Sequence, residues 1–143
     1  MNMDHINLVV RELDRMSAFF QRLGFVVEAR DRLSGEWISD IVGLRGVEAE
    51  YVKLVLPGDR VRLELIRYDR PGYDLSERTG EAHQPGFRHL AFAVKDLDAT
   101  VASLGGKDVE WFSEPQTYTK TGKRLVYFRG PEGVLLELAQ YPE

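Results

Sequence analysis

Residues 4–14 read DHINLVVRELD, and residues 88–98 read RHLAFAVKDLD. The two stretches share a histidine, a valine, a leucine and an aspartate at matching positions, namely His5 and His89, Val10 and Val94, Leu13 and Leu97, and Asp14 and Asp98. A second match, in the same order along the chain, sets VRLEL at 61–65 against VLLEL at 134–138. Each half therefore opens with a histidine segment and closes with a glutamate segment, which indicates an internal repeat.

The first copy of the repeat begins with a strand that leads into a helix. Residues 5–10 alternate in a β-rich stretch, so His5 and Asn7 are expected on one face of a strand. Asp14 has the residue type of an N-cap, whose carboxylate accepts amide protons at a helix start. Apolar residues then recur at helical spacing, and Gly24 suits the left-handed position that ends a helix. Further β-rich runs between turn residues predict the order βαβββ.

The second copy repeats this plan. A strand is expected over residues 87–94, with Asp98 as the N-cap of the following helix. The residues between the copies are rich in Gly and Pro, which is typical of a linker. The sequence thus predicts one domain built from a first βαβββ module at 3–68, a linker at 69–86 and a second module at 87–141.

The composition of the 143-residue chain excludes several classes of protein. There is no cysteine, so disulfide scaffolds, thiolate zinc sites and cysteine nucleophiles are ruled out. The formal net charge of −4 gives no support for nucleic-acid binding. Apolar runs are shorter than a membrane span and the first residues do not resemble a signal peptide, so a cytoplasmic protein is expected. Of the three histidines, only His83 has no counterpart in the repeat.

The glutamates of the repeat stand in different surroundings. Glu137 shares its expected strand face with Leu135 and Ala139, where a bare carboxylate would be costly unless it were paired, protonated or bound to a cation. Glu64 shares its face with Arg62, so a solvated surface explains it equally well. Taken alone, a strand histidine is more often structural than a ligand.

The repeat changes this balance because it relates the residues in pairs. If the two halves pack about a pseudo-twofold axis, His5, His89, Glu64 and Glu137 converge on one point. Two imidazole nitrogens and two carboxylate oxygens suit a divalent ion such as Zn, Ni, Co, Mn or Fe, and leave positions open for water or substrate. We therefore expect a metal site at these residues.

These same residues carry a resemblance to a known family. The motifs DHI at 4–6, RLEL at 62–65, GFRHLAFAV at 86–94 and GPEGVLLEL at 130–138 resemble those of the vicinal oxygen chelate superfamily, which includes glyoxalase I, methylmalonyl-CoA epimerase, extradiol dioxygenases and bleomycin resistance proteins. The resemblance covers nearly the whole chain. It implies an α+β fold in which two βαβββ modules pair into a cupped mixed sheet with the metal inside.

The ligand set separates the members of this superfamily. The four residues His5, Glu64, His89 and Glu137 are similar to the ligands of glyoxalase I, whereas extradiol dioxygenases bind metal through two histidines and one glutamate. The C-terminal strand of methylmalonyl-CoA epimerase is similar to that of this chain. The epimerase differs in having a glutamine at the position of Glu64 and a glutamate near the position of Lys53, which argues against two-base epimerisation.

Both relatives imply one chemistry, in which a proton moves on the carbon next to a carbonyl through a metal-stabilised enediolate. The chain is thus expected to be a metal-dependent isomerase or lyase. Glu137 is the expected base because of its apolar surroundings, with Glu64 as the alternative. An Fe(II) dioxygenase, another metal-dependent enzyme of specialised metabolism and a non-catalytic drug-binding resistance protein remain alternatives.

The expected substrate is a small molecule, with neither nucleic acid nor membrane as a partner. Lys120, Lys123 and Arg124 could hold its carboxylate or phosphate, although a solvated hairpin tip explains the same residues. Residues 28–50 are longer than their counterpart in the second half and could form a lid or a subunit contact. A homodimer is expected, and the sequence leaves open whether one chain or two close the site.

Overall fold

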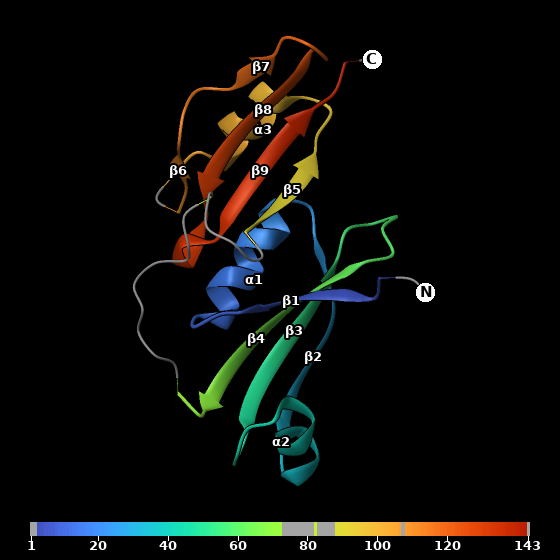
Figure 1. Ribbon diagram of the computed structural model, residues 1–143, viewed down its shortest axis with the longest axis vertical. Helices are drawn as coiled ribbons and strands as arrows, with labels where there is room; N and C mark the ends of the chain where they lie inside the picture. The colour runs from blue at the N-terminus through green and yellow to red at the C-terminus, as the bar shows by residue number, and fades with distance from the viewer. Residues whose placement is uncertain (1–2, 73–81, 83–87, 107, 143) are drawn as a thin grey trace. The chain divides into compact units, whose positions relative to one another are not determined.

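The computed structural model describes residues 3–72, 82, 88–106 and 108–142 of the chain. The chain divides into two compact units, Met1–Leu75 and Ser76–Glu143. Each unit contains one copy of the repeat and combines a mixed sheet with helix (Figure 1). The expected α+β class is therefore confirmed.

The first unit has the βαβββ plan that the two copies share, with one additional helix. Its elements are, in chain order, β1 (His5–Val9), α1 (Leu13–Arg22), β2 (Val26–Ser34), α2 (Glu36–Val42), β3 (Glu48–Val55) and β4 (Arg62–Arg70). The strands form a sheet in the order β1-β4-β3-β2, with β1 parallel to β4 and the other neighbours antiparallel. The expected βαβββ order is present, with α2 inserted between its second and third strands.

The second unit follows the same topology. Its elements are β5 (His89–Ala93), α3 (Leu97–Leu104), β6 (Glu110–Trp111), β7 (Gln116–Tyr118), β8 (Lys123–Arg129), a 3-10 turn (Pro131–Gly133) and β9 (Leu135–Gln140). The sheet runs β5-β9-β8-β6, and β7 also pairs with β8. Two short strands, β6 and β7, therefore stand where the sequence predicts one.

The linker expected at 69–86 is described only in part. Strand β4 continues to Arg70, so the first unit's sheet extends beyond residue 68. Residues 73–81 and 83–87, which include His83 and the start of the strand expected at 87–94, lie outside the described residues.

The registers of the parallel strand pairs reproduce the repeat in three dimensions. Asn7 lies opposite Glu64 across β1 and β4, and Ala91 lies opposite Glu137 across β5 and β9. His5 comes two residues before Asn7 on β1, and His89 comes two residues before Ala91 on β5. Since side chains alternate along a strand, histidine and glutamate share one face of each sheet.

Helix α1 is amphipathic and packs its apolar side on the sheet of the first unit. Its fully buried side chains are Leu13, Met16, Phe19 and Phe20. The prediction of Asp14 as the N-cap is wrong, because the helix begins at Leu13 and Glu12 takes the N-cap position without a side-chain cap. Gly24 has a φ of 97°, as expected for the residue that ends the helix.

Helix α3 shows the same offset, because its N-cap also lies two residues before the predicted one. It begins at Leu97, so Asp98 lies inside the first turn and the prediction that it caps the helix is wrong. The cap is Asp96, whose carboxylate accepts a 2.9 Å hydrogen bond from the backbone amide of Ala99. The side chain of Gln140 also accepts a hydrogen bond from the amide of Leu97, which ties the helix to β9.

Helix α2 lies within the segment 28–50 that the sequence singles out for its length. It starts after Gly35, and it ends at Gly43 in the left-handed conformation. Its buried Ile38 packs with Val47, Ala49 and Ile66 in a core cluster. Other large apolar side chains in and after the helix are exposed, namely Trp37, Ile41, Val42 and Leu44.

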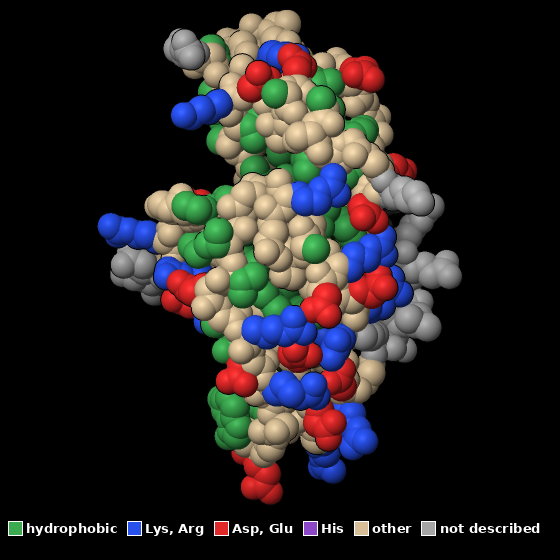
Figure 2. Space-filling view, turned by 180° about the vertical axis from the view of Figure 1, so that it is seen from behind, with side chains coloured by type: hydrophobic (Ala, Val, Ile, Leu, Met, Phe, Trp, Pro, Cys, Tyr) green, Lys and Arg blue, Asp and Glu red, His purple; other side chains and the backbone are tan. Residues whose placement is uncertain are grey.

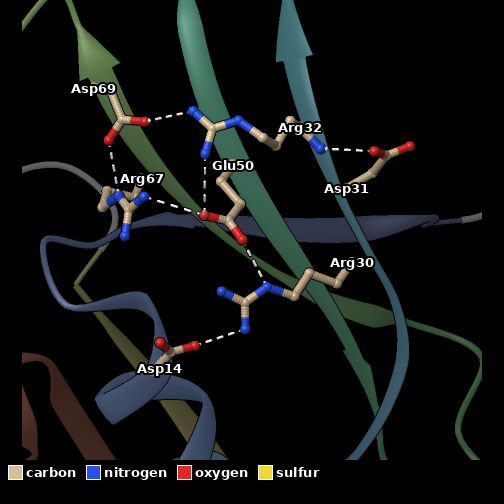
Figure 3. A network of polar contacts seen from close by, with 7 residues as sticks. All are labelled: Asp14, Arg30, Asp31, Arg32, Glu50, Arg67 and Asp69. Atoms are coloured by element: carbon tan, nitrogen blue, oxygen red, sulfur yellow. Dashed lines mark hydrogen bonds and ion pairs between the residues drawn. The ribbon is translucent and has the colours of Figure 1, made fainter.

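An ionic network joins α1 to the strands of the first unit (Figure 3). Its centre is Glu50 on β3, which accepts hydrogen bonds from Arg30 at 2.7 Å and from Arg67 at 3.1 Å. Arg30 also donates to Asp14 at 2.6 Å, and Arg32 and Arg67 both donate to Asp69. Figure 2 shows basic and acidic side chains mixed over this part of the molecule, as such pairing requires.

No helix among the described residues is both long enough and apolar enough to cross a membrane.

Candidate metal centre

Glu137 is a buried carboxylate in the middle of β9. Its exposed fraction is 4%, and its neighbours on the same strand face, Leu135 and Ala139, are equally buried at 2% and 3%. A charged group in such surroundings needs partners of opposite charge or strong hydrogen-bond donors. Its environment is the apolar strand face that the sequence predicts.

Two side chains satisfy the two oxygens of Glu137 separately. The Nε2 atom of His89 lies 3.3 Å from Oε2, and the Nζ atom of Lys123 donates a 2.8 Å hydrogen bond to Oε1. The hydrogen bond to Glu137 raises the pKa of Lys123, although burial acts in the opposite direction. The ammonium of Lys123 is therefore firmly charged at neutral pH.

Tyr127 completes the cluster from β8, directly opposite Glu137. Its hydroxyl lies 3.4 Å from Nε2 of His89, and the centroids of the two rings are 4.9 Å apart. Burial raises the pKa of Tyr127, and the negative charge of Glu137 adds to this effect. The phenol thus stays protonated and can donate a hydrogen bond toward the imidazole or the carboxylate.

Glu64 occupies the matching position in the first unit but has weaker partners. Its Oε1 accepts a 3.0 Å hydrogen bond from the side-chain amide of Asn7, and Nζ of Lys53 lies 3.8 Å from Oε2. Its side chain is 17% exposed, compared with 6% for Glu137. Lys53 faces Glu64 from β3 at the register position that Tyr127 occupies in the second unit.

His5 stands on β1 on the same face as Glu64. Its Nδ1 atom lies 2.7 Å from a carboxylate oxygen of Asp4, and this hydrogen bond lowers the pKa of Asp4. A carboxylate on Nδ1 fixes the orientation of an imidazole and directs Nε2 to a ligand, as in many histidines that bind metals.

The three cations expected to bind substrate lie in different places. Lys123 contacts Glu137, whereas both terminal nitrogens of Arg124 bind Asp98 on α3, at 2.8 and 2.9 Å. Lys120 is exposed in the turn that precedes β8. The pKa of Asp98 is lowered by its hydrogen bond with Arg124. The structure thus brings only Lys123 to the candidate site.

Each unit supplies one histidine and one glutamate of the expected ligand set. Within residues 3–72, 82, 88–106 and 108–142, no three His, Asp or Glu side chains form a group that could hold a metal ion. The donors themselves fit a divalent ion such as Zn, Ni, Co, Mn or Fe, because an imidazole nitrogen and a carboxylate oxygen are both suitable ligands. The buried carboxylate of Glu137 requires a positive charge beside it, which Lys123 supplies in the structure and which a divalent ion could share.

Comparison with known proteins assigns the chain to a family. Residues 2–138 match the model of the Glyoxalase/Bleomycin resistance protein/Dioxygenase superfamily. The chain belongs to this superfamily. The resemblance of its repeat motifs is therefore confirmed.

Individual relatives extend this result. A glyoxalase family protein from Bacillus cereus has 32% identity and a TM-score of 0.92, covering 100% of this chain and 95% of that chain. The uncharacterised protein YaeR of Escherichia coli is 32% identical, over 94% of this chain and 92% of YaeR. A 2-epi-5-epi-valiolone epimerase of Actinomyces is 27% identical, over 96% of this chain and 78% of that protein.

Proposed function

We propose that this chain is a metal-dependent isomerase or lyase of the glyoxalase I or epimerase type, which moves a proton on the carbon next to a carbonyl group. The observation that carries the proposal is the 3.3 Å approach of His89 to the buried carboxylate of Glu137, in a register that His5 and Glu64 repeat. Each unit thereby supplies one nitrogen donor and one oxygen donor.

His5, Glu64, His89 and Glu137 are the proposed ligands of one divalent ion per site, which is Zn, Ni, Co, Mn or Fe. When bound, such an ion supplies Lewis acidity that makes a hydrogen next to a chelated carbonyl more acidic. The two pairs lie in different units, so the four residues come either from one chain or from two chains of a dimer.

The contacts of the two glutamates suggest different roles for them. The apolar surroundings of Glu137 favour it as the base, but its two oxygens are held by Lys123 and His89. Glu64 has a neutral amide on one oxygen and a lysine at 3.8 Å from the other, and it is more exposed. A base must be free to reach a substrate proton. We therefore assign proton transfer as well as metal binding to Glu64, and metal binding alone to Glu137.

The substrate is proposed to be a small molecule with an oxygen next to its carbonyl. The name of the Actinomyces relative, 2-epi-5-epi-valiolone epimerase, supports proton transfer that inverts a carbon centre. Proteins of the superfamily typically form dimers and bind small molecules. We extend both properties to this chain, with the cytoplasm as its compartment and residues 28–50 as a lid or subunit contact.

Deuterium exchange tests the proposed reaction. The metal-loaded protein is incubated in deuterated water with glutathione hemithioacetal, methylmalonyl-CoA or 2-epi-5-epi-valiolone, and the label on the carbon next to the carbonyl is measured by NMR. Label incorporated into one of them supports the proposal. No exchange in any, combined with oxygen uptake in the presence of catechols, would favour a dioxygenase instead.

A further inference from the structure

The buried carboxylate of Glu137 already has a cation at hydrogen-bond distance. Lys123 lies 2.8 Å from its Oε1 atom, and the side chain of the lysine is itself only 24% exposed. The pair is therefore partly shielded from water, and the charges act on one another more strongly than at a fully exposed surface.

Lys123 reaches this position because of strand alternation. It begins β8, and its backbone neighbour Arg124 points to the opposite face, where it binds Asp98 on α3. Lys123 is thus directed to the face that carries Glu137 and His89. Its ammonium also lies 5.4 Å from the centre of the Tyr141 ring, which gives the charge a second favourable neighbour.

We propose that Lys123 is a built-in counterion of Glu137, which stabilises this half of the site without metal and lowers its affinity for a divalent cation. The inference rests on the proposed function, because it concerns the carboxylate to which we assign metal binding. A divalent ion bound by Glu137 would share the carboxylate with the ammonium of Lys123, and like charges within a few ångströms repel.

The first unit offers an internal comparison. Lys53 is 3.8 Å from Glu64, and that carboxylate is more exposed to water. Both differences weaken the electrostatic effect of a lysine on its neighbour. Lys53 should therefore lower metal affinity less than Lys123 does.

The test measures the dissociation constant for Zn²⁺ of the metal-depleted full chain by competition with a chromophoric chelator. Lys123→Met removes the charge and keeps most of the length of the side chain, and we expect Zn²⁺ to bind about tenfold more tightly or better. Lys123→Arg keeps the charge and should stay close to the wild type. Lys95→Met, at an exposed lysine of the second unit, is the matched control and should change nothing.

The melting temperature without metal gives a second readout. Lys123→Met should melt lower than the wild type, and Zn²⁺ should raise its melting temperature by more degrees. If this variant does not fold without metal, the double variant Lys123→Met/Glu137→Gln should fold, because it leaves no uncompensated charge.

The outcomes separate this inference from the proposed function. Unchanged or weaker Zn²⁺ binding by Lys123→Met, with Zn²⁺ still bound by the wild type, would overturn the counterion role and leave the metal-dependent function standing. Failure of the wild type and of every variant to bind Zn²⁺, Ni²⁺, Co²⁺, Mn²⁺ or Fe²⁺ would overturn both.

Discussion

Glu137 presents its Oε2 atom to Nε2 of His89 at 3.3 Å. The distance follows from the register of the parallel pair β5 and β9, in which Glu137 lies two residues beyond the partner of His89. The first unit uses the same register for His5 and Glu64. A feature that occurs once could be accidental, but its repetition in both units indicates that the sheets are built to present an imidazole and a carboxylate together.

The first prediction separates the roles of the two glutamates. Glu64→Gln should lower the rate of deuterium exchange by a factor of about 100 or more, while the protein keeps most of its bound metal because the amide oxygen of glutamine can still contact the ion. Glu137→Gln should instead lose metal, because its buried carboxylate is a proposed ligand. Metal analysis and NMR-detected exchange on the same samples check both.

The reverse pattern would contradict this assignment. If Glu137→Gln kept its metal and lost exchange, the base would be Glu137, as its apolar strand face alone suggests. Gln116→Glu, an exposed change of amide to carboxylate on β7, is a suitable control for the handling of the variants.

The second prediction concerns the orientation of His5. Asp4→Asn weakens the hydrogen bond to Nδ1, so the imidazole loses its fixed orientation, and metal affinity should fall by about tenfold. The melting temperature without metal should hardly change because Asp4 is exposed. Chelator competition measures the affinity, with the exposed Asp59→Asn as control. Equal affinity in both variants would remove Asp4 from the site.

The third prediction concerns the ionic network of the first unit. Glu50→Gln removes the negative charge between three arginines, and we expect a loss of roughly 1–3 kcal/mol in the free energy of unfolding. Glu48→Gln on the same strand breaks a single exposed pair with Arg70 and should cost less than about 0.5 kcal/mol. Urea unfolding compares the two. Similar losses in the two variants would show that the network stabilises the fold no more than a single surface ion pair does.

The fourth prediction is a pH dependence. Arg124 lowers the pKa of Asp98 below its ordinary value of 3.8, so the ion pair contributes stability above that pH and loses it as pH falls through the lower, folded-state pKa. Asp98→Asn should therefore melt below the wild type near neutral pH, and the difference should shrink below pH 3.8. Melting curves between neutral and acidic pH check this. A constant difference would mean that charge plays no part.

The repeat made much of the fold, and the shared strand face of each histidine and glutamate, predictable from the sequence. Matching histidines and glutamates predicted two copies of one topology, and the registers of Asn7 with Glu64 and Ala91 with Glu137 agree with that alignment. The alignment of the two copies predicts these positions correctly because both parallel strand pairs have the same register. Helix α2 was not predicted, since it exists in the first unit only and no second copy marks it.

Side-chain partners depend on details that the pattern lacks. Lys123 and Arg124 form one basic cluster in the sequence, but strand alternation sends one to Glu137 and the other to Asp98. Asp14 is a typical capping residue, yet the N-cap is Glu12, two residues earlier, and the carboxylate of Asp14 accepts a hydrogen bond from Arg30 instead. The exact start of an element decides both cases, and helix ends are fixed by tertiary contacts as much as by residue type.

Metal content tests the central claim most directly. The purified chain, loaded with Zn²⁺, Ni²⁺, Co²⁺, Mn²⁺ or Fe²⁺ and dialysed, should retain about one ion per chain of at least one of these metals, and alanine variants of His5, Glu64, His89 and Glu137 should each retain less. Loss of metal both from variants of the first unit and from variants of the second would show that the two pairs bind the same ion. A wild-type content below ~0.1 ion per chain for every metal tested would contradict the account.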